Sequence, residues 1–232
     1  MSMQVVILAG GLATRMRPLT LTIPKMLLEV GNRPFADLQL ERLHAAGYRN
    51  VVLCVAHLGE QLRAHVGDGA RFGLEVRYSD EGPNLRGTGG ALCQAWNDLE
   101  PEFLVTYGDS WLPFDYASPL AALRRHHDCD AVMSVYKNDG KFDGSNVRTD
   151  GVIVTAYEKG TTDPGFDHID YGALAFRKAA LEPWRDRHTW DLAEVQTALA
   201  RAGRLRAVVA TERFYEIGSP EGLEALTRHL QA

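Results

Sequence analysis

The feature that most constrains this chain lies near its start, where a short apolar strand runs directly into a glycine pair and a cationic loop. Residues 5–8 read Val-Val-Ile-Leu, and Gly10 and Gly11 follow. The same loop then carries three cations: Arg15, Arg17 and Lys25. Glycine lets backbone approach a ligand closely, arginine binds phosphate bidentately, and lysine acts as a point charge. This combination predicts a polyphosphate-binding loop in preference to a tight turn with solvated charges.

The spacing in this loop is that of neither of two common phosphate-binding motifs. The GxxxxGK[ST] spacing of the P-loop is missing, and so is the GxGxxG pattern of dinucleotide-binding folds. The loop therefore predicts a different class of nucleotide site.

Strand and helix signals alternate through the first half of the chain. The expected strands are residues 5–8, 51–55, 74–78, 103–107 and 131–135. The expected helices are residues 35–46, 60–66, 91–99 and 118–127, the last with Ser118 as its N-cap and Pro119 at its first position. Short apolar strands separated by helices predict a mostly parallel sheet covered on both faces. Such sheets bind ligands at the carboxyl ends of their strands.

The pattern changes after Tyr136. A hairpin is expected over 147–158, a strand over 171–176, a helix from Asp191 to Gly203, a strand over 205–209, and a last helix opened by Ser219 and Pro220. We interpret residues 1–232 as a single domain. Its nucleotide-binding core comprises about 1–136 and 205–232, and a small acceptor-binding lobe comprises about 137–204.

Composition excludes several classes of protein. With 45% apolar and 24% charged residues the chain is globular, and no apolar run approaches the roughly 20 residues of a membrane helix. The net charge of −5 argues against a nucleic-acid partner. Three widely spaced cysteines, Cys54, Cys93 and Cys129, predict free thiols in a reducing cytoplasm.

The N-terminal motif carries a family resemblance. The run from Leu8 to Thr20, followed by Pro24 and Lys25, resembles the LAGGxGTRxRPLTxxxPK motif of the sugar-1-phosphate nucleotidylyltransferases. The resemblance extends over nearly the whole chain and is nearest to short bacterial members: heptose- and mannose-1-phosphate guanylyltransferases and N-acetylmuramate-1-phosphate uridylyltransferases. It implies an α/β fold of nucleotide-diphospho-sugar transferase type, a Rossmann-like, mostly parallel mixed sheet flanked by helices. Ala13 departs from the motif, which has glycine there.

The resemblance also implies where the nucleotide binds. Arg15 and Lys25 would be catalytic, while Arg17 would be structural. The implied nucleotide-binding residues are Leu8, Ala9, Gly10, Gly11, Thr14, Glu81, Gly87, Thr88 and Gly108. Among them, Gly87 and Thr88 belong to a Gly-Thr-Gly-Gly turn that would receive the base.

Two acids match the metal-binding positions of the family. Asp109 follows an apolar strand in Tyr107-Gly108-Asp109, and Glu216 stands where the family's W-x-D-x-G-T segment has aspartate. Carboxylates and phosphate oxygens are the ligands that Mg²⁺ prefers. We therefore expect Asp109, which is also catalytic, and Glu216 to bind Mg²⁺, although either acid also fits an ordinary strand-end turn.

The acceptor side departs more from the family. The residues that match sugar-phosphate-binding positions are Asn146, Glu158, Lys159, Asp170 and Gly172. Several of these positions sit in altered motifs, which suggests an acceptor unlike glucose 1-phosphate. For Asn146 and Asp170 a purely structural turn role is nearly as good an interpretation.

The predicted reaction transfers a nucleoside monophosphate from an NTP to a sugar 1-phosphate, for the synthesis of a surface glycan. The acidic residue Glu81 favours GTP, because a carboxylate accepts both N–H donors of guanine. UTP with an amino-sugar or muramic-type 1-phosphate remains the alternative. Two other classes stay open: a non-catalytic sensor of nucleotide or sugar phosphate, and a metal-dependent glycosyltransferase. The sequence leaves the oligomeric state open, a homo-oligomer included.

Overall fold

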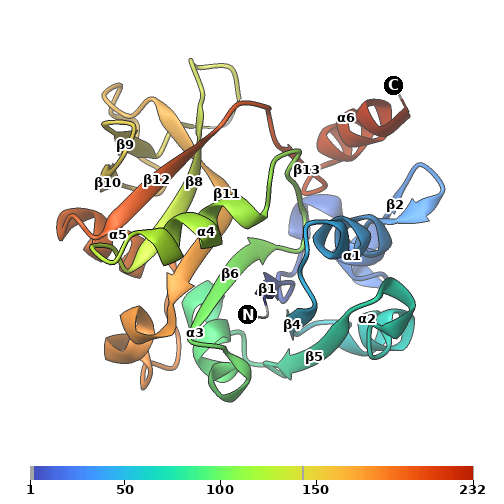
Figure 1. The fold of residues 1–232 in the computed structure, drawn as a ribbon. Helices are drawn as coiled ribbons and strands as arrows, with labels where there is room; N and C mark the ends of the chain where they lie inside the picture. The colour runs from blue at the N-terminus through green and yellow to red at the C-terminus, as the bar shows by residue number, and fades with distance from the viewer. Residues whose placement is uncertain (1–2, 143, 232) are drawn as a thin grey trace.

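A computed structural model describes residues 3–142 and 144–231. Within these residues nine strands form one mixed sheet, with the order β12-β8-β11-β6-β1-β4-β5 and with β9 and β10 attached beside β11 (Figure 1). The strands are β1 (Gln4–Leu8), β4 (Asn50–Val55), β5 (Glu75–Asp80), β6 (Glu102–Tyr107), β8 (Ala131–Lys137), β9 (Val147–Thr149), β10 (Val154–Tyr157), β11 (His168–Arg177) and β12 (Leu205–Ala210). The predicted mixed, mostly parallel sheet is confirmed: β1 pairs in parallel with β4 and β6, β4 with β5, and β8 with β12.

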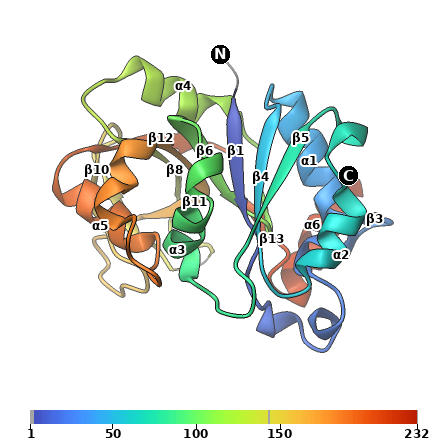
Figure 2. The same ribbon diagram turned by 90° about the horizontal axis from the view of Figure 1, so that it is seen from below.

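Helices cover both faces of this sheet because successive strand residues point to opposite sides. Val5 and Ile7 of β1 belong to the apolar cluster under α1, α2 and α4, whereas Val6 and Leu8 belong to the cluster under α3 and α5 (Figure 2). The helices are α1 (Phe35–Ala45), α2 (Gly59–Val66), α3 (Gly87–Gln94), α4 (Ala117–Arg125), α5 (Ala193–Arg201) and α6 (Pro220–Gln231). None of the helices in the described ranges is long and apolar enough to cross a membrane.

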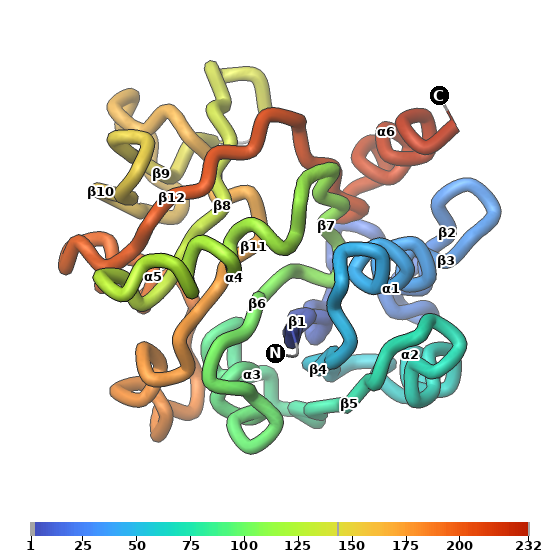
Figure 3. The backbone as a smooth tube through the Cα atoms, in the orientation of Figure 1, coloured from blue at the N-terminus to red at the C-terminus, as the bar shows by residue number. Residues whose placement is uncertain are grey.

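The second half of the chain enters the sheet rather than lying beside it. β11 runs antiparallel between β6 and β8, so residues from 137–204 supply a strand of the main sheet. The predicted hairpin is formed by β9 and β10. The last segment then returns to the first half, where β13 (Tyr215–Glu216) pairs with β7 (Ser110–Trp111) and α6 packs beside the β2–β3 hairpin (Figure 3). That hairpin consists of β2 (Glu29–Val30) and β3 (Arg33–Pro34).

Two helix starts differ from the sequence prediction. Helix α3 begins at Gly87, not at residue 91, because the N–H groups of Gly89 and Gly90 donate to the carbonyl oxygen of Trp190, at 3.1 and 3.3 Å. A glycine run is a poor helix former by itself, so this distant carbonyl supplies what local propensity lacks.

Ser118 is not the cap of α4. The helix starts at Ala117, whose N–H donates to the Asp115 side chain at 2.9 Å, and the Ser118 hydroxyl donates to the Asp115 carbonyl at 2.8 Å. Asp115 therefore accepts the hydrogen bonds that the first turn of α4 donates. Asp191, the predicted cap of α5, lies one residue before the N-cap, which is Leu192, and its side chain accepts from the N–H of Ala193 at 2.9 Å.

Candidate functional site

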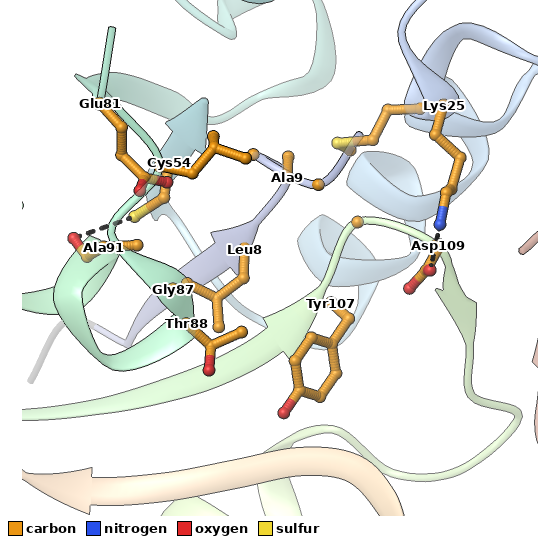
Figure 4. Close-up of a pocket in the computed structure, with 15 residues that line it drawn as sticks. Leu8, Ala9, Lys25, Cys54, Glu81, Gly87, Thr88, Ala91, Tyr107 and Asp109 are labelled. Atoms are coloured by element: carbon orange, nitrogen blue, oxygen red, sulfur yellow. Dashed lines mark hydrogen bonds and ion pairs between the residues drawn. The ribbon is translucent and has the colours of Figure 1, made fainter. Parts of the chain in front are cut away.

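A cavity of about 230 Å³ opens at the carboxyl ends of β1, β4 and β6 (Figure 4). It contains most of the residues expected to bind nucleotide: Leu8, Ala9, Gly10, Gly11, Glu81, Gly87, Thr88 and Gly108. Lys25 and Asp109 line the same cavity. Its remaining lining residues were not among those expected to bind a ligand: Met26, Cys54, Leu85, Ala91 and Tyr107. The cavity therefore brings together segments that lie up to a hundred residues apart.

Glycines keep this cavity open. A Cβ atom at Gly10 would stand 2.6 Å from Oε1 of Glu81, and one at Gly108 would stand 2.9 Å from the sulfur of Met26. Both distances are far below van der Waals contact, so a larger residue would displace the cavity wall. The backbone of both loops is consequently available to a flat or anionic ligand.

An ion pair closes one end of the cavity. Lys25 lies in a 3₁₀ turn (Lys25–Leu27) of the cationic loop, and Asp109 directly follows β6. Their Nζ and Oδ2 atoms are 2.7 Å apart, and the side chains are only 18% and 24% exposed. Partial burial reduces the screening of this pair by solvent, so both charges are fixed where a phosphate would enter.

Thr14 and Arg15 lie outside this cavity. Both belong to a 3₁₀ turn (Thr14–Met16) on the protein surface. Arg15 instead lines a second pocket with Glu216 and Gly218. A Cβ atom at Gly218 would be 3.0 Å from Nη2 of Arg15 and 3.8 Å from Oδ2 of Asp109, so the guanidinium group stands near the Asp109 carboxylate. Arg15 thus borders the expected reaction centre from the side opposite the nucleotide cavity.

Ala13 adopts the left-handed conformation that the family's glycine would adopt more easily. Its φ and ψ are 46° and 45°. The hydroxyl group of buried Thr20 donates to the Ala13 carbonyl at 2.8 Å and so holds the loop in place. An alanine in this region carries a conformational cost that glycine avoids.

The two expected metal-binding acids lie on paired segments. Glu216 of β13 stands opposite Ser110 of β7, and the N–H of Ile217 donates to the Asp109 carbonyl at 2.9 Å. In the described part of the chain no three His, Cys, Asp or Glu side chains form a metal cluster. Mg²⁺ is commonly held by one or two carboxylates together with substrate phosphates, so this pair fits such an ion.

Asn146 and Asp170 are engaged with each other and with the surrounding backbone. The Asn146 side-chain oxygen accepts from the N–H of Asp170 at 2.8 Å. The Asp170 carboxylate accepts from the N–H of Gly172 at 3.0 Å and from the side chain of Gln196 at 2.8 Å. Burial raises the pKa of Asp170 above its ordinary value. The structure therefore brings these three acceptor-side residues together in one network.

Glu158 and Lys159 lie on an exposed turn beside that network. Lys159 forms an ion pair of 2.7 Å with Asp191. The other oxygen of Asp191 accepts from the hydroxyl of Thr88 at 3.3 Å, and Thr88 in turn accepts from the N–H of Leu192 at 2.8 Å. Asp191 hence connects the expected acceptor lysine to the nucleotide cavity.

The sequence predicted Asp191 only as a helix cap and did not reveal its contacts with Lys159 and Thr88. Burial acts to raise the pKa of Asp191, but the Lys159 ammonium group and the hydrogen bonds from Ala193 and Thr88 outweigh it and lower the pKa. Its carboxylate form is therefore stabilised. Asp191 lies 32 residues from Lys159 in the chain, a contact that only the tertiary fold creates.

Glu81 lies on the wall of the nucleotide cavity opposite Lys25 and Asp109 (Figure 4). Its Oε2 atom accepts from the N–H of Arg86 at 2.7 Å, and its Oε1 atom faces Gly10. Burial raises the pKa of Glu81, against the lowering effect of the Arg86 hydrogen bond. The acid is thus held by the backbone with one oxygen directed toward the glycine loop.

Fold and cavity together define an α/β protein with a cationic glycine loop and a Lys–Asp pair at the carboxyl ends of its parallel strands. The chain belongs to the nucleotidyl transferase family, whose pattern it matches over residues 4–229.

Individual relatives carry several substrate names. The chain is 28% identical over 220 residues to a mannose-1-phosphate guanylyltransferase of Mycobacterium tuberculosis, covering 93% of this chain and 61% of that protein. It is 39% identical over 117 residues to an N-acetylmuramate alpha-1-phosphate uridylyltransferase of Neisseria meningitidis, covering 50% of this chain and 51% of that protein. The chain thus spans well under two thirds of the length of these relatives.

A solved structure has the same fold. The crystal structure of HddC from Yersinia pseudotuberculosis superposes with a TM-score of 0.81 at 24% identity, covering 98% of this chain and 99% of the other. The fold predicted from the alternation of strands and helices is therefore confirmed.

Proposed function

We propose that this protein transfers a nucleoside monophosphate from an NTP to a sugar 1-phosphate, forming an NDP-sugar and pyrophosphate. The observation that carries this proposal is the position of Lys25 and Asp109, paired at 2.7 Å where the glycine-lined cavity ends. Family membership over residues 4–229 supports the same reaction class.

The chemistry requires positioning more than proton transfer. A sugar phosphate has a second pKa near 6, so its attacking oxygen is mostly ionised at pH 7. That oxygen forms a bond to the α-phosphorus of the NTP while the bond from the α-phosphorus to the bridging β-oxygen breaks, and pyrophosphate leaves. Lys25 would neutralise charge at the α-phosphate, and Arg15 would bind the leaving phosphates. Alignment and charge neutralisation dominate such transfers.

We further propose that Asp109 and Glu216 hold a magnesium ion. The support is their position on paired segments and the hard oxygen donors that they provide. When bound, the ion would supply neutralisation of phosphate charge.

For the base we propose guanine. Glu81 directs one carboxylate oxygen into the cavity, and a carboxylate is the natural acceptor for the two N–H donors of guanine. The name of the Mycobacterium relative agrees with GTP. The Neisseria relative, similar over half of this chain, is named for a uridylyl transfer and keeps UTP as the alternative.

On the acceptor side we propose that Lys159 meets the phosphate of the sugar, with Asp170, Asn146, Gly172 and Glu158 around the sugar. The support is that Asn146, Asp170 and Gly172 are joined by hydrogen bonds and the N–H of Glu158 donates to the Asn146 carbonyl, while Lys159 on the same turn reaches Thr88 of the nucleotide cavity through Asp191. The three free thiols favour a reducing compartment, and we propose that the reaction is cytoplasmic.

The test is pyrophosphate release with Mg²⁺ across five nucleotides (GTP, UTP, CTP, dTTP and ATP) and several sugar 1-phosphates. We expect one productive combination that EDTA abolishes and that the Asp109→Asn variant loses. Nucleotide binding by calorimetry without any pyrophosphate release would contradict the proposal and favour a sensor. Binding of an NDP-sugar but of no sugar 1-phosphate would favour a glycosyltransferase.

A further inference from the structure

A second pocket, of about 200 Å³, lies next to the proposed reaction centre, and of its residues the proposed function uses Arg15 and Glu216. Its lining comes from three distant parts of the chain: Arg15, Phe142, Arg213–Glu216, Gly218, Ser219 and Gly222. Because Gly218 lies close to Asp109, the pocket begins where the acceptor phosphate would react. From there it extends away from the nucleotide cavity.

Arg213 is the most constrained cation of this pocket. Its guanidinium carbon lies 4.5 Å from the ring centre of Phe142 and 4.4 Å from that of Tyr215, so the group is held between two aromatic rings. Its Nε–H donates to the Phe214 carbonyl at 3.3 Å. Among the described residues neither terminal nitrogen of Arg213 makes a hydrogen bond or an ion pair, so this bidentate edge of the arginine is available to a ligand.

The charge of the pocket favours an anion. Arg15 and Arg213 both line it, and neither has a carboxylate within ion-pair distance among residues 3–142 and 144–231. Glu216 is the acid that lines the same pocket, and it is one of the two proposed metal ligands. Two guanidinium groups against one carboxylate leave a local positive charge, which would increase with a cation bound to Glu216.

The pocket is also joined to the acceptor side of the site. Phe142 ends a turn in which its N–H donates to the side chain of Asn138 at 3.0 Å, and the Asn138 side chain donates to Ser145 at 3.0 Å. Ser145 is the neighbour of Asn146, which belongs to the proposed sugar network. Hydrogen bonds thus connect Phe142 of the pocket to the turn that precedes the proposed sugar network.

We propose that this pocket binds a negatively charged substituent of the acceptor sugar, with Arg213 as its principal contact, and that the enzyme prefers acidic sugar 1-phosphates over neutral ones. The proposal rests on the proposed function and specifies its substrate class. Restraint of Arg213 between two rings means that little side-chain freedom is lost on binding. A carboxylate on the sugar would complete a bidentate pair with Arg213 that no carboxylate among residues 3–142 and 144–231 provides.

Two pairs of acceptors, each consisting of a neutral sugar 1-phosphate and an acidic derivative of it, test this inference. Glucuronic acid 1-phosphate differs from glucose 1-phosphate by a carboxylate at C6, and N-acetylmuramate 1-phosphate differs from N-acetylglucosamine 1-phosphate by a lactyl ether. We expect kcat/KM for the acidic member to be higher by about tenfold or more in at least one pair, the usual effect of a charge-assisted hydrogen bond. Ratios near one in both pairs would overturn the proposal.

Variants assign the preference to this pocket. Arg213→Gln should bring the ratio of acidic to neutral kcat/KM close to one, and Arg213→Lys, which keeps the charge, should retain part of it. Arg148→Gln is the matched control, because Arg148 also stacks on an aromatic ring, Phe166 at 4.8 Å, but lies outside the pocket. Its ratio should equal that of the wild type. Equal losses for both members of a pair in Arg213→Gln would count against the inference.

Pyrophosphate is the other anion that this pocket could accept. In the reverse reaction, an Arg213→Gln variant with a raised KM for pyrophosphate and an unchanged acceptor ratio would assign the pocket to the leaving group and overturn the proposal. Calorimetric titration of the matched acceptors against wild type and Arg213→Gln decides the question without turnover. A failure of pyrophosphate release for every substrate would thus count against the proposed function while leaving this binding comparison to decide the inference.

Discussion

The ammonium group of Lys25 lies 2.7 Å from the Oδ2 atom of Asp109, and this ion pair joins the cationic loop to the end of β6. The two residues are separated by 84 positions in the chain. A phosphate and a metal ion entering the site would each compete for one member of the pair. The ion pair therefore fixes both side chains before substrate binds. Less side-chain entropy is then lost when a phosphate or a metal ion replaces one partner.

Replacement of Lys25 by methionine should reduce kcat by about a hundredfold, which corresponds to roughly 3 kcal/mol of lost charge stabilisation in the transition state. The change also leaves Asp109 without its cation, so thermal unfolding of the variant should be measured alongside pyrophosphate release. Arg33→Met is the control, because it removes one positive charge from an exposed ion pair with Glu41. Near-native turnover of a folded Lys25→Met variant would refute the catalytic role.

Ala13→Gly should stabilise the protein by about 1 kcal/mol, because glycine adopts the left-handed conformation without the steric cost that alanine has there. The free energy of unfolding in urea measures this. Gly151→Ala is the converse control: Gly151 has a φ of +92° and open space around it, so the variant should be less stable. An unchanged midpoint for Ala13→Gly would mean that the Thr20 hydrogen bond already offsets the strain.

Much of the fold could be predicted because its signals are local. Buried parallel strands such as β1 and β4 are short apolar runs, and helices follow them at regular intervals. The predicted start of α3 was wrong because the real start depends on the Trp190 carbonyl, about a hundred residues away in the chain. A Cβ atom at Gly89 would overlap the Trp190 ring, so the glycine that disfavours a helix locally is required by the tertiary packing.

The sequence predicted only the part of the candidate site that lies within recognisable motifs. Gly10, Gly11 and Lys25 of the first loop line the cavity as expected, whereas Arg15 lines the second pocket. The direction of Arg15 and the contact between Lys159 and Asp191 were not predictable, because each depends on segments that only the folded sheet brings together. Residue types indicate which chemistry a site can perform, but the direction of each side chain is known only from the structure.

Asp191→Asn should raise the KM for the sugar 1-phosphate about tenfold and leave the Kd for the NTP nearly unchanged. The reason is that Lys159, at 63% exposed, loses the partner that directs it, and a partly exposed charged hydrogen bond of this kind contributes about 1 kcal/mol. Steady-state kinetics and calorimetry separate the two effects. Asp163→Asn is the control, because Asp163 forms a comparable exposed ion pair with Arg148 on the far hairpin. A fall in kcat with unchanged KM would contradict a positioning role for Asp191.

As the pH decreases, the affinity for GTP should begin to fall at a higher pH than it would if Glu81 had an ordinary glutamate pKa. Only the ionised form of Glu81 accepts both N–H donors of guanine, and burial raises its pKa above the usual value of about 4.3. Affinity is therefore full above the raised pKa and is lost as the pH drops through it. Calorimetric Kd values for GTP and UTP across this range measure the effect.

Glu81→Gln separates this titration from other groups in the site. The amide cannot ionise and has a single acceptor oxygen, so GTP affinity should fall about tenfold at neutral pH and lose the part of its pH dependence that Glu81 causes. Asp80→Asn is the matched control, because the neighbouring acid is exposed and accepts from the N–H of Gly82 outside the cavity. If Glu81→Gln instead weakens UTP and leaves GTP unchanged, the acid serves a uridine site, and the base assignment proposed above is wrong.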